Sequence, residues 1–391
     1  MRHPQAESRG CAANSQRAAS TAPLSRAQVR IGIDAGQLAH PHTGIGRYTL
    51  ELCRALDSLL PNAQFFVYSR DPVDAPVESS RWTVRVERVA ASRRLHDWLW
   101  MTFRCSAMCA KDDLNIFWAA RTLAPSLRAS TKCVVTVYDL FHLDRQLVSL
   151  KRWLFYRWFV DRALRRADVI VTISNDAASE LRRLRGYESD AVVRPAVSSN
   201  FRPRDESEIQ SCLRQYNLAR PYLLNISRWD PKKNLTALLQ AFLGMKRKGL
   251  IPKYALALVG GPDGNDKGND HLRRLVREGK SSGVALVGPV REEHLAALYS
   301  GCEAFVFPSS HEGFGIPVLE ARACGARIVA ADSKALREAG GIDAVYVTPT
   351  VKGIRHGILV ALSSHALPAQ KRGLWTWAES GEVFVKALIA T

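Results

Sequence analysis

Residues 311–330 read HEGFGIPVLEARACGARIVA, directly after the apolar run EAFVFPS at 303–309. The run predicts a buried strand, Gly313 and Gly315 predict a tight turn, and Pro317 suits the first turn of a helix. A strand, a tight turn and a helix in this order belong to a βαβ unit. The stretch therefore predicts an α/β fold with a parallel sheet.

The turn in this stretch has the chemistry of an anion site. The free N–H groups of residues 313–316 are expected to point outward at the positive end of the helix dipole, where a diphosphate binds well. Glu312 in the turn and Glu320 on the helix flank this position with hydrogen-bond acceptors. A nucleotide sugar, with hydroxyls at both ends and phosphates between them, fits this pattern. An isolated pair of acids also fits a solvated loop and helix.

A second stretch, LLNISRWDPKKNLTALLQAF at 223–242, has a similar organisation. It predicts a strand, a polar loop that carries Arg228 and Lys233, and a helix that opens at Asn234. Two cations at the carboxyl end of a strand can neutralise a leaving diphosphate. A solvated basic turn is the alternative for this stretch taken alone.

The rest of the chain repeats the alternation of strands and helices twice, which predicts two Rossmann-like domains with doubly wound parallel sheets. The carboxyl ends of both sheets are expected to face a cleft between the domains. Expected strands lie at 30–36, 65–70, 115–118, 132–140, 168–174, 222–227, 254–261, 284–288, 303–309 and 327–331, and expected second-domain helices at 234–248, 271–279, 292–300 and 316–324. The expected divisions are a disordered extension at 1–28, a first domain at 29–198, a linker at 199–219, a second domain at 220–372 and a helix at 373–391 that packs back on the first domain.

Composition agrees with a folded two-domain protein of 391 residues. Lys and Arg number 55 against 37 Asp and Glu, a net charge of +18 that favours anionic partners. The eight cysteines contain no Cys-x-x-Cys pair, and no apolar run is long enough to span a membrane, so we expect a reduced, cytoplasmic location. Residues 1–28 lack the apolar stretch of a secretory signal, although an Arg- and Ser-rich start also occurs in organelle transit peptides.

Together these stretches resemble the retaining glycosyltransferases of the GT-B fold, family 4, also called the group 1 glycosyltransferases. Their hallmark of Glu, seven residues and Glu matches Glu312 and Glu320, and their Arg/Lys pair matches Arg228 and Lys233. The segment IGIDAGQLAHPHTGIGRYTLEL at 31–52 resembles the glycine loop of bacterial mannosyl- and rhamnosyltransferases. The resemblance covers about residues 30–389.

The resemblance implies a role for each matching residue. Glu312 contacts the donor sugar, Glu320 holds the ribose hydroxyls, and Arg228 with Lys233 stabilises the departing diphosphate. Asp139 is a candidate for positioning the acceptor, with a helix cap as the alternative. The implied catalytic residues are Glu312, Arg228 and Lys233, and the implied substrate-binding residues are Gly44, Gly46, Arg47, Asp139, Gly313, Phe314, Gly315, Ile316 and Glu320.

The sequence departs from the family at the end of the fourth or fifth strand of the first domain, where many relatives have a histidine. Trp118 and Tyr138 stand at these places and His142 is displaced, so we assign no first-domain histidine a role. No Asp-x-Asp triplet occurs, and the pair of Arg228 and Lys233 can replace a divalent cation. We therefore expect no metal and no other cofactor.

The expected reaction transfers a hexose, mannose or rhamnose, from a nucleotide sugar to a saccharide or polyprenyl-diphosphate-linked acceptor in surface polysaccharide synthesis. A GDP-sugar is the expected donor. Segments 93–105 and 151–166 mix basic and aromatic residues, which suits either an interfacial helix on anionic lipid or an ordinary core-facing helix. The first reading adds peripheral contact with the inner face of the cytoplasmic membrane.

Three other functions stay open from the sequence. Gly44-Ile45-Gly46 could belong to an NAD-type Rossmann oxidoreductase, but position 49 is Thr and 311–330 would be unexplained. The charge could indicate a nucleic-acid-binding protein, but no RRM, KH or helix-turn-helix pattern accompanies it, so we expect no nucleic-acid partner. A GT-B relative that isomerises or phosphorolyses sugars is the third.

Overall fold

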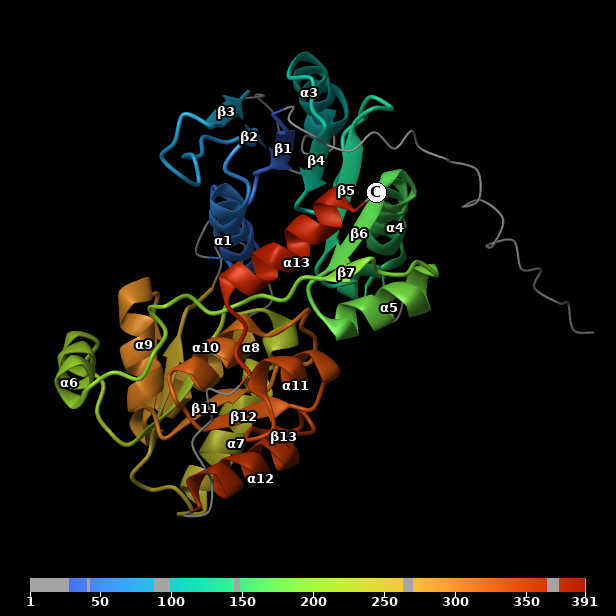
Figure 1. Cartoon of the computed structure of the whole chain (residues 1–391). Helices are drawn as coiled ribbons and strands as arrows, with labels where there is room; N and C mark the ends of the chain where they lie inside the picture. The colour runs from blue at the N-terminus through green and yellow to red at the C-terminus, as the bar shows by residue number, and fades with distance from the viewer. Residues whose placement is uncertain are drawn as a thin grey trace, which may run out of the picture.

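The computed structural model describes residues 28–40, 43–87, 99–143, 148–262, 270–363 and 373–390. It contains two α/β domains, one above the other in Figure 1. The extension expected at 1–28 lies outside the described residues up to position 27, and so do residues 93–98 of the first basic aromatic segment.

The first domain is built on a seven-stranded parallel sheet with the order β3-β2-β1-β4-β5-β6-β7. Its five expected strands are confirmed, with shorter or shifted ends. Two short strands were not predicted as such, because WTVRV is half polar and the last pairing takes only two residues. The strands are β1 (Arg30–Asp34), β2 (Gln64–Ser69), β3 (Trp82–Val86), β4 (Ile116–Ala119), β5 (Lys132–Val137), β6 (Val169–Thr172) and β7 (Ala191–Val192).

The second domain has a six-stranded parallel sheet with the order β10-β9-β8-β11-β12-β13. Five of its strands and the four expected helices are confirmed, the helices to within one residue at each end. The strands are β8 (Tyr222–Ile226), β9 (Ala255–Val259), β10 (Val284–Gly288), β11 (Ala304–Phe307), β12 (Ile328–Ala331) and β13 (Val345–Val347).

Helices cover both faces of each sheet (Figure 1). In the first domain they are α1 (Gly44–Leu59), η1 (Trp100–Cys105), α3 (Ser106–Lys111), η2 (Phe141–Leu143), α4 (Leu150–Arg166) and α5 (Asn175–Arg185). The rest are α6 (Glu206–Gln215), η3 (Pro231–Lys233), α7 (Leu235–Arg247), α8 (Asp270–Gly279), η4 (Lys280–Ser282), α9 (Glu292–Gly301), α10 (Ile316–Ala323), α11 (Lys334–Gly340), α12 (Val351–Leu362) and α13 (Trp377–Ile389).

Helix α6 lies inside the segment predicted as a linker, 199–219. Asp205 and Glu208 form a capping box, in which each side chain accepts a hydrogen bond from the other residue's backbone N–H. Helix α6 then packs on α9 through the buried side chains of Ile209, Cys212 and Leu213. The polar composition that suggested a linker therefore belongs to the exposed face of an amphipathic helix.

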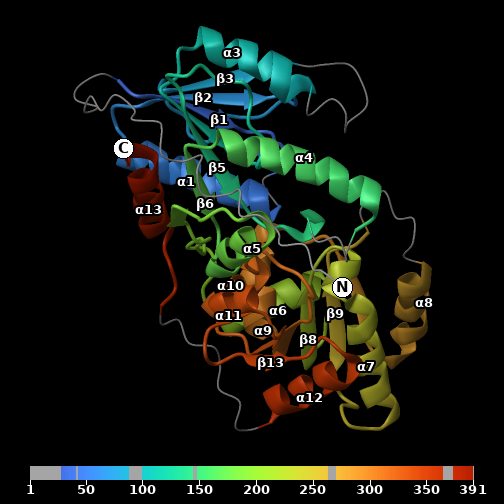
Figure 2. The same cartoon turned by 90° about the vertical axis from the view of Figure 1, so that its right-hand side faces the viewer.

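The last helix, α13, returns to the first domain and lies along α1, as Figures 1 and 2 both show. Gly381 permits the close approach, since a Cβ atom there would lie 2.7 Å from the Cβ of Ala55. The ring of Phe384 packs 4.7 Å from that of Trp118, whose indole N–H donates to Thr136 at 2.8 Å. Trp118 is thus a core residue, at one of the places where the resemblance implies a histidine.

Strand order reverses direction between β1 and β4 in the first sheet and between β8 and β11 in the second. In doubly wound sheets the loops that leave the carboxyl ends at such a reversal are the usual ligand-binding loops. The loops after β8 and β11 carry the two charged motifs of the sequence.

Candidate active site

Lys233 and Glu312 meet because β8 and β11 are neighbours in the sheet. The ammonium nitrogen of Lys233 lies 2.5 Å from Oε1 of Glu312, and the side chains are only 15% and 11% exposed. The same ammonium lies 5.0 Å from the centre of the Phe307 ring. A charge pair this enclosed is sensitive to the loss of either partner, because the remaining charge is buried without compensation.

Backbone and amide contacts hold the loops after β8 and β11 together. Asn234, in a left-handed conformation with φ of 56°, donates from its side chain to the carbonyl of Pro308 at 3.3 Å and to that of Pro349, after β13, at 2.7 Å. The backbone N–H of Ser310 donates to the carbonyl of Lys232 at 2.8 Å, and the Ser309 hydroxyl donates to the same oxygen at 3.0 Å. These anchors were not predicted, since they depend on which loops the sheet order brings together.

The turn at 313–316 faces the first domain. The Ser174 hydroxyl donates to the carbonyl of Gly313 at 2.6 Å, and a Cβ atom at Gly313 would lie 2.7 Å from the carbonyl oxygen of Tyr138. Gly315 has a φ of +102°, and no side chain caps α10 at this end. The turn therefore needs both glycines, and it leaves the amino end of α10 without a side-chain cap.

The predicted glycine loop reaches the same place from the other domain. A Cβ atom at Gly44 would lie 3.5 Å from Cδ1 of Ile316, while Phe314 is buried beneath the turn. Gly46 has a different reason for being glycine, because a Cβ atom there would lie 2.2 Å from the carbonyl oxygen of His40. Gly44 thus lies against the turn, and Gly46 closes the loop before α1.

Glu320 is 5% exposed on α10. Its Oε2 accepts a hydrogen bond from the Tyr299 hydroxyl at 3.1 Å, and its Oε1 pairs with Arg47 of α1. Burial raises the pKa of this carboxyl to about 7, although the charge of Arg47 opposes the rise. Sequence reasoning missed Tyr299, whose neighbours along the chain show no sign of this contact.

Arg228 and Asp139 lie in the loops after β8 and β5. Arg228 stands two positions after the end of β8, is exposed, and precedes Lys233 by five positions in the same loop. Asp139 follows β5, and its carboxylate lies 3.7 Å from the ammonium of Lys232. The structure therefore brings Glu312 together with Lys233, and it places Asp139 beside the neighbouring lysine across the domain boundary.

Comparisons with known proteins decide the family. Residues 214–359 match a family model described as "Glycosyl transferases group 1", and residues 43–196 match one described as "Glycosyl transferase 4-like domain". The O-antigen chain mannosyltransferase B of Escherichia coli is 34% identical over 365 residues, which cover 86% of this chain and 90% of that protein. The chain is a group 1 glycosyltransferase.

Further relatives and solved structures agree with this membership. The serotype-specific mannosyltransferase WbdA of Escherichia coli is 31% identical over 258 residues, 62% of this chain and 30% of that protein. A sucrose-phosphate synthase from Thermosynechococcus elongatus has a TM-score of 0.69 at 21% identity, covering 93% of this chain and 95% of its own. The glycosyltransferase WaaG has a TM-score of 0.68 at 12% identity, covering 92% and 95%. The fold of this glycosyltransferase is therefore GT-B, and the family replaces the oxidoreductase and nucleic-acid-binding alternatives.

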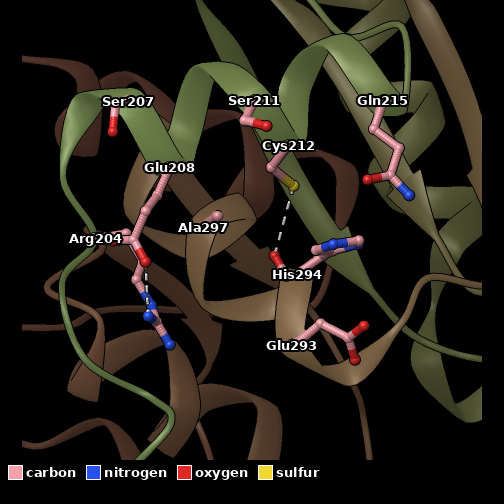
Figure 3. Close-up of a pocket in the computed structure, with 9 residues that line it drawn as sticks. All are labelled: Arg204, Ser207, Glu208, Ser211, Cys212, Gln215, Glu293, His294 and Ala297. Atoms are coloured by element: carbon pink, nitrogen blue, oxygen red, sulfur yellow. Dashed lines mark hydrogen bonds and ion pairs between the residues drawn. The ribbon is translucent and has the colours of Figure 1, made fainter.

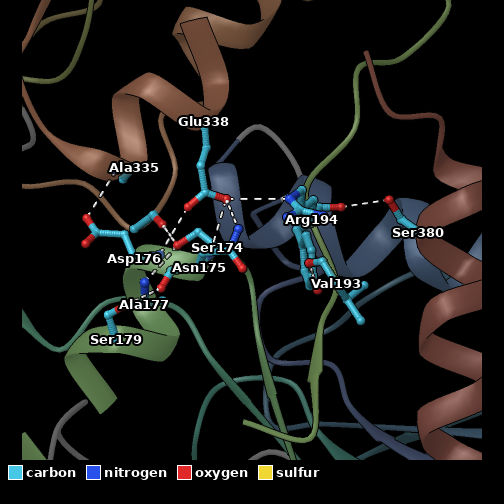
Figure 4. Close-up of polar contacts among 12 residues, drawn as sticks. Ser174, Asn175, Asp176, Ala177, Ser179, Val193, Arg194, Ala335, Glu338 and Ser380 are labelled. Atoms are coloured by element: carbon cyan, nitrogen blue, oxygen red, sulfur yellow. Dashed lines mark hydrogen bonds and ion pairs between the residues drawn. The ribbon is translucent and has the colours of Figure 1, made fainter. Parts of the chain in front are cut away.

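A polar network joins the two domains of the glycosyltransferase beside the turn at 313–316 (Figure 4). The Glu338 carboxylate on α11 accepts hydrogen bonds from the backbone N–H of Asn175 at 3.2 Å and of Asp176 at 3.1 Å. In return the Asp176 carboxylate accepts from the backbone N–H of Ala335 at 3.2 Å. Each helix thus supplies the carboxylate that caps the amino end of the other.

Two further features of the glycosyltransferase lie apart from these residues. A surface hollow between α6 and α9 contains none of the residues predicted for the donor (Figure 3); it is lined by Arg204, Ser207, Glu208, Ser211, Cys212, Gln215, Glu293, His294 and Ala297. Across the described ranges, no three His, Cys, Asp or Glu side chains gather as metal ligands would. No helix within those ranges is long and apolar enough to cross a bilayer.

Proposed function

We propose that this glycosyltransferase moves mannose from a nucleoside diphosphate sugar to a saccharide acceptor with retention of anomeric configuration. The observation that carries the proposal is the mostly buried pair of Lys233 and Glu312, in the loops at the amino end of α10, which no side chain caps. This arrangement offers a cation and helix N–H groups to a diphosphate, and a carboxylate to sugar hydroxyls.

Each of these residues is proposed to bind a different part of the donor. Lys233 and Arg228 take the diphosphate, and the backbone at 313–316 takes the phosphates and part of the sugar. Glu312 accepts from the sugar hydroxyls, and Glu320 accepts from the ribose. A diphosphate in this position gives Lys233 a second anionic partner beside Glu312. The charge of Lys233 is therefore compensated both with and without the donor.

The proposed chemistry places the largest charge change at the leaving diphosphate. As the bond from the anomeric carbon to the phosphate oxygen breaks, fixed cations and the dipole of α10 stabilise the new charge. The acceptor oxygen attacks the same face of the sugar, and its proton passes to the departing phosphate oxygen. This route needs no base from the first domain and no metal.

Mannose is favoured by the relatives named mannosyltransferases, and GDP-mannose is therefore the first donor to test. A solved structure of Anabaena HepE in complex with UDP and glucose, which shares the fold at a TM-score of 0.64, makes UDP-glucose the competing donor. A thermal-shift panel of GDP-mannose, GDP-rhamnose and UDP-glucose separates them. The largest stabilisation by GDP-mannose is expected, and stabilisation by UDP-glucose alone would overturn the mannose assignment.

The proposed acceptor is a polyprenyl-diphosphate-linked saccharide of a surface polysaccharide, on the inner face of the cytoplasmic membrane. The relative named for O-antigen synthesis supports this choice. Product analysis with and without acceptor tests transfer directly. Hydrolysis of the nucleotide sugar at an equal rate in both cases would favour an enzyme that only cleaves or rearranges the donor.

Helix α4 supports the membrane part of the proposal. Leu154, Phe155 and Trp158 lie on one side of the helix and are exposed by 52%, 43% and 48%. Exposed cations on the same helix, Lys151 and Arg157 among them, complement an anionic lipid surface. The described part of segment 93–105 adds Phe103, which is also exposed.

Vesicle co-sedimentation tests α4. We expect binding to vesicles of phosphatidylglycerol and phosphatidylcholine, and weaker binding of the double variant Phe155→Ser/Trp158→Ser. The matched control is Ile342→Ser, because Ile342 is an exposed apolar residue of the second domain. Equal binding of both variants would rule out α4 as the docking surface.

A further inference from the structure

Arg47, in the first domain, contacts Glu320 of the second domain, the carboxylate that is proposed to hold the ribose of the donor nucleotide. It lies on α1, and its guanidinium pairs with Oε1 of Glu320 through one nitrogen and with Oε2 of Glu292 at 3.0 Å through the other. The guanidinium carbon also lies 5.4 Å from the centre of the Phe201 ring. With 11% of its side chain exposed, Arg47 is held in place from three sides.

The contacts of Glu320 leave part of its hydrogen-bonding capacity unused. An ionised carboxylate can accept about four hydrogen bonds, two on each oxygen. Arg47 occupies one position on Oε1, and the Tyr299 hydroxyl occupies one on Oε2. One position on each oxygen stays open, which matches the two neighbouring hydroxyls of a ribose.

We propose that Arg47 is a positioning residue that orients Glu320 and favours its ionised form, so that this carboxylate can accept both ribose hydroxyls. The proposal rests on the proposed function, in which Glu320 holds the ribose.

The charges around Glu320 support this role. Burial raises the pKa of Glu320 to about 7 even with Arg47 in place, and Glu292 of α9 raises it further. The charge of Arg47 and the hydrogen bond from Tyr299 oppose this rise. Burial also raises the pKa of the Tyr299 hydroxyl, so that hydroxyl stays protonated and donates. Without Arg47 the pKa of this carboxyl would rise further, so a larger share of it would be protonated at neutral pH and would lose acceptor positions.

Calorimetric titration with GDP and UDP between pH 6 and pH 9 tests the proposal. In Arg47→Met, the affinity for the nucleotide that binds should fall severalfold at pH 7, because removal of the guanidinium raises the pKa of Glu320 further. It should recover toward the wild-type value at pH 9. Comparison with wild type at each pH cancels the ionisation of the nucleotide itself. Affinity for inorganic diphosphate, which has no ribose, should not change.

Three variants control this experiment. Arg47→Lys keeps the positive charge, so the midpoint of the pH dependence of nucleotide affinity should stay at the wild-type value. This variant also provides a test if Arg47→Met does not fold. Glu320→Gln cannot ionise and should abolish the pH dependence with or without Arg47. Arg54→Met is the matched control on α1, since Arg54 is exposed and pairs with Glu51 of the same helix.

The outcomes separate the two hypotheses. An unchanged pH profile in Arg47→Met, with normal nucleotide binding by wild type, would overturn the role of Arg47 and leave the proposed function intact. If wild type bound neither nucleotide nor inorganic diphosphate, the proposed function would fail and the inference with it.

Discussion

The ammonium of Lys233 lies 2.5 Å from a carboxylate oxygen of Glu312, although the two residues are 79 positions apart in the chain. Their strands, β8 and β11, are neighbours at the point where the sheet order reverses. A cation and an anion therefore stand side by side at the edge of the sheet where a doubly wound fold binds its ligands.

Replacement of Glu312 by alanine should lower turnover more than donor affinity, because the proposed contact is with the reacting sugar. We expect a loss of kcat of about 100-fold, typical of removing one electrostatic stabiliser. The control is Glu303→Ala, which removes a partly exposed acid at the other end of β11. Steady-state kinetics decide: activity within about threefold of wild type, under 1 kcal/mol, would reject the role.

Lys233→Ala should weaken the binding of GDP, UDP and inorganic diphosphate by at least tenfold, as expected for the loss of a charged hydrogen bond. Lys232→Ala is the matched comparison. The ammonium of Lys232 lies 3.7 Å from Asp139 of the first domain instead, so its loss should affect nucleotide affinity less. Calorimetry that found equal effects for the two lysines would contradict the assignment.

Glu320 should make the stability of the protein depend on pH. Its folded-state pKa of about 7 lies above the ordinary value of 4.5, so the folded state holds this proton more tightly than the unfolded state. The resulting stabilisation is full below pH 4.5 and is lost as the pH rises through 7. The Tm of wild type minus that of Glu320→Gln should therefore be larger at pH 5 than at pH 8. A Tm difference that grows as the pH rises would contradict the predicted direction of this pH dependence.

Glu338→Ala should loosen the contact between the domains, because it removes the acceptor of the N–H groups at the start of α5. The helix itself should persist, since Ser174 still accepts from the N–H of Ala177 at 2.9 Å. We expect amide exchange at Asn175 and Asp176 to accelerate about tenfold or more. Glu188→Ala, which removes an exposed partner of Arg182, is the control and should leave those amides protected.

Transfer activity should survive EDTA, because Lys233, Arg228 and the amino end of α10 supply the positive charge that a divalent cation supplies elsewhere. The assay compares initial rates before and after chelation, with and without added Mg²⁺ or Mn²⁺. Loss of activity in EDTA that either ion restores would refute the metal-free mechanism.

The site residues that could be predicted are those that can be identified from their neighbours in the sequence. Glu312, Gly313, Gly315 and Lys233 stand in strand–turn–helix stretches that can be read within twenty residues. Helix α6 was missed although its capping box of Asp205 and Glu208 is a local signal, because the polar composition of 199–219 was interpreted as a linker. Tyr299 was missed because it has no special neighbours in the chain and contacts Glu320 from another helix.

The sequence by itself determined the alternation of strands and helices, the two-domain α/β architecture and the acids and cations at the strand ends. These depend on the order of apolar and turn-forming residues along short segments. Only the tertiary structure decided that Lys233 pairs with Glu312, that Arg47 reaches Glu320 across 273 positions, and that α5 and α11 cap each other. Those contacts depend on strand order and on how the domains close, which no local pattern of residues encodes.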